Sequence, residues 1–310
     1  MIEVDGLVKR YGAKTAVNNL SFTVKPGIVT GFLGPNGSGK STTMRLILGL
    51  DAPSSGTAMV NGRRYADHRA PLAEVGALLE ARSVHTGRSA YNHLLALAQT
   101  HGIPSSRVTQ VLELVGLQEV ARKRAGKFSL GMGQRLGIAA ALLGDPATVM
   151  LDEPVNGLDP EGILWVRHLL RSLAAEGRTV FVSSHLMSEM ALTADHLIVI
   201  GRGELIADTS VQDFIDGASR NLVRVRSPRM AELAQLLATT GGVVTTVEGG
   251  VDVAGLSAAQ IGDAAAANGI AVHELTPLQA SLEEAFMDMT RDSVEFHAVD
   301  ADAPTAGVTS

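Results

Sequence analysis

The sequence predicts an α/β fold built around a parallel β-sheet, followed by a smaller α+β domain. Short strand-like runs alternate with helical segments, and glycine-rich turns separate them, which is typical of a parallel sheet. After about residue 220 the order becomes strand, helix, strand, strand, helix, strand, which indicates a ferredoxin-like domain. We therefore expect a large domain over residues 1–220, a small domain over 221–296 and a disordered tail over 297–310.

The composition indicates a globular protein with a large core. Of the 310 residues, 45% are hydrophobic and 19% are charged, which is too apolar for a disordered chain. The net charge of -6 disfavours a nucleic-acid binder, because binding to phosphate backbones needs clustered Lys and Arg. We expect no nucleic-acid partner. The absence of cysteine excludes disulfides, thiolate metal sites and cysteine nucleophiles.

The sequence contains no pattern of a segment that enters a membrane. Acids stand among residues Met1 to Asp5, where a secretory signal has basic residues. No run of about 18 apolar residues, the length that a spanning helix needs, occurs in the chain. We expect a cytoplasmic protein, and any role at a membrane then requires a partner.

The first 80 residues alternate strand-like runs with turns around one long helix. Enrichment in β-branched and aromatic residues predicts strands over Ile2–Val8, Leu20–Val24, Ile28–Leu33, Thr57–Val60 and Val75–Leu79. Helical spacing of apolar residues predicts a helix over Lys40–Leu50.

Further along, helical spacing dominates before strands return. Apolar residues recur at helical intervals from Ser89 to Gly144, which predicts a helical insertion over about residues 82–145. We then expect strands over Thr148–Leu151, Thr179–Val182 and Leu197–Ile200, with a helix over Ile163–Ala175. This alternation continues the parallel sheet.

The small domain has its own series of elements. We expect strands over Leu222–Arg226, Val243–Val247, Val251–Val253 and Ile270–Glu274, and helices over Met230–Leu237 and Ala258–Ala267. A last helix is predicted over Leu278–Met289, because Thr276 and Pro277 before it suit a cap and a first turn.

A phosphate-binding pattern joins the strand that ends at Leu33 to the helix that follows. The pattern G-x-x-x-x-G-K-[ST] is matched by Gly34, Pro35, Asn36, Gly37, Ser38, Gly39, Lys40 and Ser41, with Thr42 next in the helix. Glycines let successive backbone N–H groups face phosphate oxygens, and the helix N-terminus adds a favourable dipole. Lys40 then reaches the β- and γ-phosphates, and Ser41 ligates Mg²⁺. The sequence predicts a P-loop NTPase that binds ATP and Mg²⁺.

Two acids follow an apolar strand later in the chain. Asp152, at the end of that strand, is placed to hold Mg²⁺ through water, and Glu153 is placed to polarise the attacking water. His185 follows another strand and is expected to sense the γ-phosphate. We expect Lys40, Glu153 and His185 to be catalytic.

Over about residues 1–215 the chain resembles the ATP-binding-cassette ATPases, because further motifs of that family follow in order. The signature L-S-G-G-Q corresponds to Phe128-Ser129-Leu130-Gly131-Met132, and the D-loop to Asn156-Gly157-Leu158-Asp159. The resemblance implies a cassette with an antiparallel β subdomain. It also implies that Tyr11 stacks on adenine, that His185 is the switch histidine, and that Ser129 and Gly131 contact the γ-phosphate of a partner copy.

The chain departs from the family pattern at two motifs. Leu130 and Met132 replace a Gly and the Gln of the signature, and Glu80 stands where the family has the Q-loop Gln. A Glu oxygen can still face Mg²⁺, but it adds charge. Both departures, and the closing segment Leu282–Phe286, are similar to the branch of the family that exports drugs and antibiotic peptides.

One phosphate loop per chain implies a second cassette subunit, expected as a homodimer, and the resemblance implies a separate integral-membrane permease. The chain would then lie on the inner face of the cell membrane through that permease. The alternative is a soluble cassette ATPase that acts on the ribosome or on DNA. A regulatory binder without hydrolysis is disfavoured because Glu153 and His185 are present, and a GTPase because no N-K-x-D segment occurs.

Overall fold

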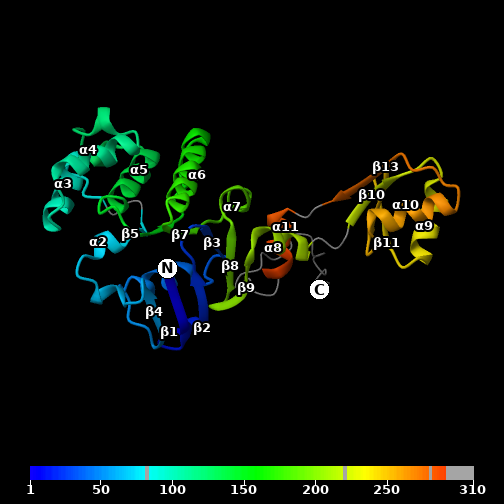
Figure 1. Cartoon of the computed structure of the whole chain (residues 1–310), viewed down its shortest axis with the longest axis horizontal. Coiled ribbons are helices and arrows are strands. Elements are labelled where there is room, and N and C mark those ends of the chain that lie inside the picture. The colour runs from blue at the N-terminus through cyan, green and yellow to red at the C-terminus, as the bar shows by residue number, and fades with distance from the viewer. Residues whose placement is uncertain (81–83, 219–221, 279–280, 291–310) are drawn as a thin grey trace, which may run out of the picture.

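The computed structural model describes residues 1–80, 84–218, 222–278 and 281–290, whose strands form three sheets (Figure 1). The largest sheet has the strand order β5-β6-β7-β3-β8-β9. Its strands are β3 (Val29–Leu33), β5 (Val75–Leu78), β6 (Thr148–Asp152), β7 (Thr179–Ser183), β8 (His196–Gly201) and β9 (Glu204–Ser210). All neighbouring pairs are parallel except β8 with β9. The predicted parallel core is confirmed.

A smaller antiparallel sheet packs against the large one. It contains β1 (Ile2–Tyr11), β2 (Lys14–Val24) and β4 (Ser55–Val60), in the order β2-β1-β4. The ring centroid of Phe22 in β2 lies 5.8 Å from that of Phe32 in β3 and 5.9 Å from that of Phe181 in β7. This aromatic contact between the sheets fixes β3, and with it the loop that follows β3.

Helices surround the large sheet. They are α1 (Lys40–Ile47), α2 (Pro71–Glu74), α3 (Ala90–Thr100), α4 (Ser105–Leu114), α5 (Leu130–Ala141), α6 (Pro160–Ala175), α7 (Met187–Thr193) and α8 (Val211–Ala218). Figure 1 shows α3, α4 and α5 grouped beside α6. They occupy the span in which the sequence predicts a helical insertion, and Leu94, Val111 and Leu136 are fully buried there.

Four elements of this part are not predicted from the sequence: β9, α7, α8 and the four-residue helix α2. No side chain of β9 is fully buried, so the strand lacks a clear apolar alternation, and it lies at the edge of the sheet. Helices α7 and α8 have seven and eight residues, which is too short for a clear periodic pattern. Their existence depends on packing against the rest of the core.

The small unit, residues 222–278, has its own sheet and core. Its strands are β10 (Leu222–Arg226), β11 (Val243–Val247), β12 (Gly250–Ala254) and β13 (Glu274–Leu278), in the antiparallel order β11-β12-β10-β13. Two helices, α9 (Met230–Thr239) and α10 (Ala258–Ala267), accompany them. Figure 1 shows this unit set apart from the rest of the chain. The predicted ferredoxin-like order is confirmed.

The prediction of a strand over Ile270–Glu274 is wrong, because the last strand of the small unit is β13, over Glu274–Leu278. Ile270 is buried, but it lies in the connection after α10. Pro277 is inside β13, where it pairs with Val223. A proline is tolerated there because β13 is an edge strand that pairs with β10 on one side.

The last helix, α11 (Leu282–Thr290), begins later than the predicted Leu278. Ser281 caps it, since its hydroxyl accepts a hydrogen bond from the Glu284 N–H at 3.1 Å. Leu282, Ala285 and Phe286 are buried in the core of the large sheet and its helices.

Helix α11 therefore packs on the large unit, which we define as residues 1–80, 84–218 and 281–290. It contacts α8 and α7, and Phe286 belongs to the same buried cluster as Met190 of α7 and Phe214 of α8. This differs from the predicted small domain over 221–296, which includes the helix. The sequence alone does not show on which unit the last helix packs, because its apolar face could be buried in the core of the large unit or in that of the small unit. The predicted tail over 297–310 lies outside the described residues.

Candidate functional site

The predicted phosphate loop lies between β3 and α1, at the carboxyl edge of the parallel strands. Gly37 and Gly39 have φ angles of 82° and 105°, which side chains other than glycine rarely allow. A Cβ atom on Gly39 would lie 2.5 Å from the Ala16 carbonyl oxygen. Gly39 is also the N-cap of α1. These glycines give the loop its tight curl and leave backbone N–H groups at the start of the helix for an anion.

Lys40 reaches back across the loop. Its Nζ donates hydrogen bonds to the carbonyl oxygens of Gly34 at 2.5 Å and Pro35 at 3.2 Å. Burial lowers the pKa of the Lys40 amine, and the charges of Glu153 and Asp152 oppose that shift. The ammonium therefore lies between the loop and two carboxylates, where a phosphate can take over its hydrogen bonds.

Ser41 and Asp152 meet across the site although they are 111 positions apart. The Ser41 hydroxyl donates to Oδ2 of Asp152 at 2.8 Å, and the Ser183 hydroxyl donates to Oδ1 of the same carboxylate. A serine oxygen and a carboxylate are hard oxygen donors, which Mg²⁺ prefers. The chemistry of these two groups fits the predicted Mg²⁺ site.

Glu153 follows Asp152 and has a left-handed backbone, with φ at 51°. Its Oε2 lies 2.7 Å from Nδ1 of His185 and accepts a longer hydrogen bond, 3.3 Å, from the His185 N–H. The Glu153 side chain is about one quarter exposed and that of His185 about half exposed. The two predicted catalytic groups thus contact each other.

A cleft of about 460 Å³ brings together the loop, Lys40, Ser41, Asp152 and Glu153, whereas His185 is not among its lining residues. It is lined by Tyr11, Lys14, Ala16, Asn36, Gly37, Ser38, Gly39, Lys40, Ser41, Thr42, Asp152 and Glu153. Tyr11 is half exposed, and its hydroxyl donates to Asp51 at 3.2 Å. The Nζ of Lys9 lies 4.8 Å from the centre of the Tyr11 ring. The structure thus brings the predicted aromatic group, loop and acids together in one cleft.

The signature residues lie elsewhere in the large unit. Ser129 is the N-cap of α5 and accepts a hydrogen bond from the Met132 N–H at 3.2 Å. A Cβ atom on Gly131 would lie 3.1 Å from the carbonyl oxygen of Gly157, which places it beside the predicted D-loop. Leu130 is half exposed. Ser129 and Gly131 are not among the residues that line the cleft.

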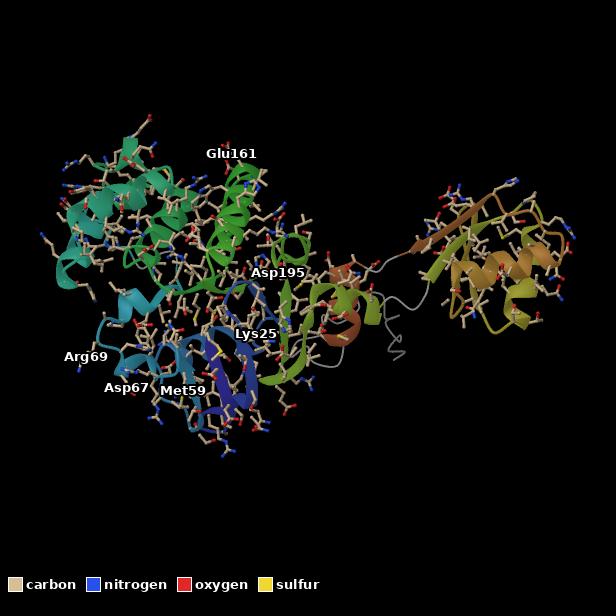
Figure 2. All side chains as sticks on the ribbon, viewed as in Figure 1. Lys25, Met59, Asp67, Arg69, Glu161 and Asp195 are labelled. Atoms are coloured by element: carbon tan, nitrogen blue, oxygen red, sulfur yellow. The ribbon has the colours of Figure 1, made fainter. Side chains whose placement is uncertain are left out.

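The D-loop leads directly into α6. Asp159 is the N-cap of α6, and its Oδ1 accepts a hydrogen bond from the Gly162 N–H at 3.0 Å. Glu161 in the first turn adds a negative charge where the helix dipole favours it; Figure 2 shows it at the outer end of α6.

Glu80 is not brought into the cleft. It follows β5, is exposed, and is absent from the residues that line the cleft. Its charge acts on Arg45, whose pKa is raised mainly by the hydrogen bond to Asp51 and to a smaller extent by Glu80. The predicted contact between Glu80 and Mg²⁺ stays a prediction.

Three side chains at or beside the site were not predicted. Lys14 lines the cleft, Ser183 holds Asp152, and Gln134 donates its Nε2 to the Glu153 carbonyl oxygen at 3.0 Å. Ser183 directly follows the strand predicted over Thr179–Val182, so its position at the carboxyl edge of the sheet could have been inferred from the sequence. Gln134 lies inside a helix, and sequence spacing alone does not indicate its contact.

Among the described residues, no helix is both long and apolar enough to cross a membrane. No group of three or more metal-ligating His, Cys, Asp or Glu side chains occurs in the described part of the chain. A metal bound by Ser41 and Asp152 would therefore need further ligands from the nucleotide or from water.

Comparisons with known protein families match both parts of the chain. The family described as ABC transporter matches residues 17–156, which include the phosphate loop and both acids. A domain of unknown function, DUF8746, matches residues 221–283. The second match covers the small unit and assigns no activity to it.

Known relatives resemble the chain over most of their length. The Bacitracin transport ATP-binding protein BcrA of Bacillus licheniformis is 43% identical over 211 residues, which are 67% of this chain and 69% of the relative. The uncharacterized ABC transporter ATP-binding protein YhcH of Bacillus subtilis is 35% identical over 303 residues, which are 95% and 97% of the two chains. A solved ATP binding subunit of an ABC transporter is similar with a TM-score of 0.64 and 26% identity, over 70% of this chain and 92% of that chain.

Proposed function

The chain belongs to the ABC transporter family, and on this premise we propose that it powers the export of an antibiotic peptide or drug through a separate permease. It binds and hydrolyses ATP as the ATPase subunit of such a transporter. The observation that carries the proposal is the convergence of Lys40, the Ser41–Asp152 pair and Glu153 on one cleft, with His185 in contact with the Glu153 carboxylate. The cargo class follows from the similarity to a bacitracin transport protein.

Each group has a role in phosphoryl transfer to water. Lys40 and the N–H groups of the loop stabilise the negative charge that develops on the γ-phosphoryl group. Glu153 accepts a proton from the attacking water, and His185, held at 2.7 Å from the Glu153 carboxylate, keeps that carboxylate aimed at the water. Ser41 and Asp152 would hold Mg²⁺, which supplies positive charge to the phosphate oxygens when bound.

A second copy of the chain completes the site. Ser129 and Gly131 lie outside the cleft of their own chain, and Ser129 stands at the N-terminus of α5, where an anion binds favourably. We assign these residues to the nucleotide of the partner copy in a homodimer. Leu130 and Met132 offer no polar side-chain contact, so the Ser129 hydroxyl and backbone N–H groups make this contact.

Tyr11 stacks on the adenine ring in this proposal. Its ring lines the cleft and is half exposed, which leaves an aromatic surface available for a base. The permease binds the cytoplasmic subunit at the membrane, and Glu80 with the segment that follows it transmits the change in the nucleotide to the permease. The alternative of an ATPase that acts on the ribosome or on DNA is not favoured, because the named relatives are transport proteins.

The test uses a bacterial strain that lacks the transporter and is sensitive to bacitracin. Expression of the chain together with its permease should restore resistance. The matched Glu153→Gln variant, expressed to the same level, should not restore resistance, because the amide cannot accept a proton from water. Resistance without the permease, or equal resistance with Glu153→Gln, contradicts the proposal.

A further inference from the structure

Glu153 has a backbone conformation that the surrounding structure must maintain. Its φ angle of 51° lies in the left-handed region, which is unfavourable for a residue other than glycine. Such a conformation persists where neighbouring groups hold it. A change in φ at this residue would move its carboxylate away from His185.

The backbone of Glu153 is held by two side chains from different elements. Its N–H donates to the Ser183 hydroxyl of β7 at 3.1 Å. Its carbonyl oxygen accepts a hydrogen bond from Nε2 of Gln134 in α5 at 3.0 Å, and a second one from the Asn156 N–H at 3.2 Å. The backbone is therefore fixed on both sides of the Cα atom.

Gln134 makes this contact from a buried position. The residue is 1% exposed, and its Oε1 has no hydrogen-bond partner among the described residues. Burying an amide with an unsatisfied oxygen costs free energy, and an apolar residue of similar size would avoid that cost. The bond to Glu153 is the feature at this position that an apolar residue could not supply.

We infer that Gln134 is a positioning residue for ATP hydrolysis: its amide holds the Glu153 backbone so that the carboxylate faces the attacking water. This inference rests on the proposed role of Glu153. Gln134 lies in α5, the helix that Ser129 caps, so it also ties the signature segment to the catalytic carboxylate of the same chain. A shift of α5 on contact with a partner copy is transmitted to Glu153 through this hydrogen bond.

The experiment compares Gln134→Met and Gln134→Leu with the unmodified full-length chain. Methionine and leucine fill the buried position with apolar atoms but have no hydrogen-bond donor. The Glu153 carbonyl keeps its bond from Asn156, so we expect both variants to fold. Gln99→Met, at an exposed position of α3, is the control for the chemical change alone.

A loss of positioning lowers kcat and leaves substrate binding unchanged. We expect kcat for ATP to fall about 10- to 100-fold in both variants, which is the size of effect that small misplacements of catalytic groups produce. The KM for ATP and the melting temperature should stay close to those of the control. A crystal structure of either variant should show the Glu153 carboxylate displaced from His185.

Two results overturn the inference. One is an unchanged kcat in Gln134→Met, which would show that Gln134 only fills space in the core. The other is a fall in kcat with Glu153 still in the left-handed conformation and in contact with His185. If a variant fails to fold, the other variant decides. Glu153→Gln is measured in parallel: if it keeps full hydrolysis, the proposed role of Glu153 is wrong, whatever Gln134 does.

Discussion

Nδ1 of His185 lies 2.7 Å from Oε2 of Glu153, although the residues are 32 positions apart. The contact results from the parallel pairing of β6 with β7, in which Asp152 lies opposite Ser183. Both strands end at the same edge of the sheet, so the residues that follow them meet. Catalysis by this chain is therefore expected to depend on strand register as well as on the two side chains.

Glu153→Gln should retain ATP binding and lose hydrolysis. The amide fills the same space but is a poor proton acceptor, and loss of a general base typically costs about 10²–10⁴-fold in rate. The bound ATP should then persist and hold two copies together. Gel filtration with ATP is expected to show a dimer, and elution as a monomer at all ATP concentrations would count against the second copy.

Lys40→Ala should abolish measurable ATP turnover, because it removes the cation that offsets charge on the transferring phosphoryl group. Removal of a single stabilising donor of this kind costs about 10²–10³-fold in kcat. Lys25→Ala, at an exposed site that Figure 2 labels, is the control. A Lys40→Ala protein that hydrolyses ATP at the rate of the control would refute this assignment.

Phe286→Ala should destabilise the large unit. Phe286 is 6% exposed and packs in the cluster that contains Met190 and Phe214, and truncation of a buried Phe typically costs about 3–5 kcal/mol. Met287→Ala, at a residue that is 64% exposed, is the control. Chemical denaturation should show a lower free energy of unfolding for Phe286→Ala alone. Equal values for the two variants would mean that α11 does not contribute to this core.

Replacement of residues 222–278 by a short flexible linker should spare ATP binding. The cleft is lined by residues up to Glu153, and α11 would remain to cover the buried cluster. Truncation after residue 218, in contrast, also removes α11 and exposes Met190 and Phe214. Fluorescent ATP titration should give a similar affinity for the linker variant and the full chain. A large loss of affinity in the folded linker variant would place part of the nucleotide site in the small unit.

Glu80→Ala should impair transport more than ATP binding. Glu80 follows β5 and lies outside the cleft, so its removal leaves the phosphate contacts intact. Its proposed role is to move with the segment that leads to the helical insertion when the γ-phosphate is lost. Transport is measured with the permease, and ATP binding is measured on the isolated subunit. Proportionate loss of both, or loss of neither, would exclude a coupling role.

The local parts of the site were predictable from the sequence. A strand, a glycine-rich turn and a helix follow one another in the chain, so the loop from Gly34 to Ser41 could be recognised from a local pattern. The pattern of an apolar strand ending in Asp152 and Glu153 likewise identified the acids. The same holds for α10, whose bounds match the prediction, because its apolar spacing and its capping box with Ser257 are local.

Only the tertiary structure determines the contacts between distant segments. The pairing of Ser41 with Asp152, the hold of Gln134 on Glu153 and the return of α11 to the large unit all join residues that are far apart in the chain. An amphipathic helix or a buried glutamine matches many partners equally well, so its sequence does not select one. The partner of each side chain is determined only when the whole core packs. Strand register and close packing then allow each buried side chain a single position.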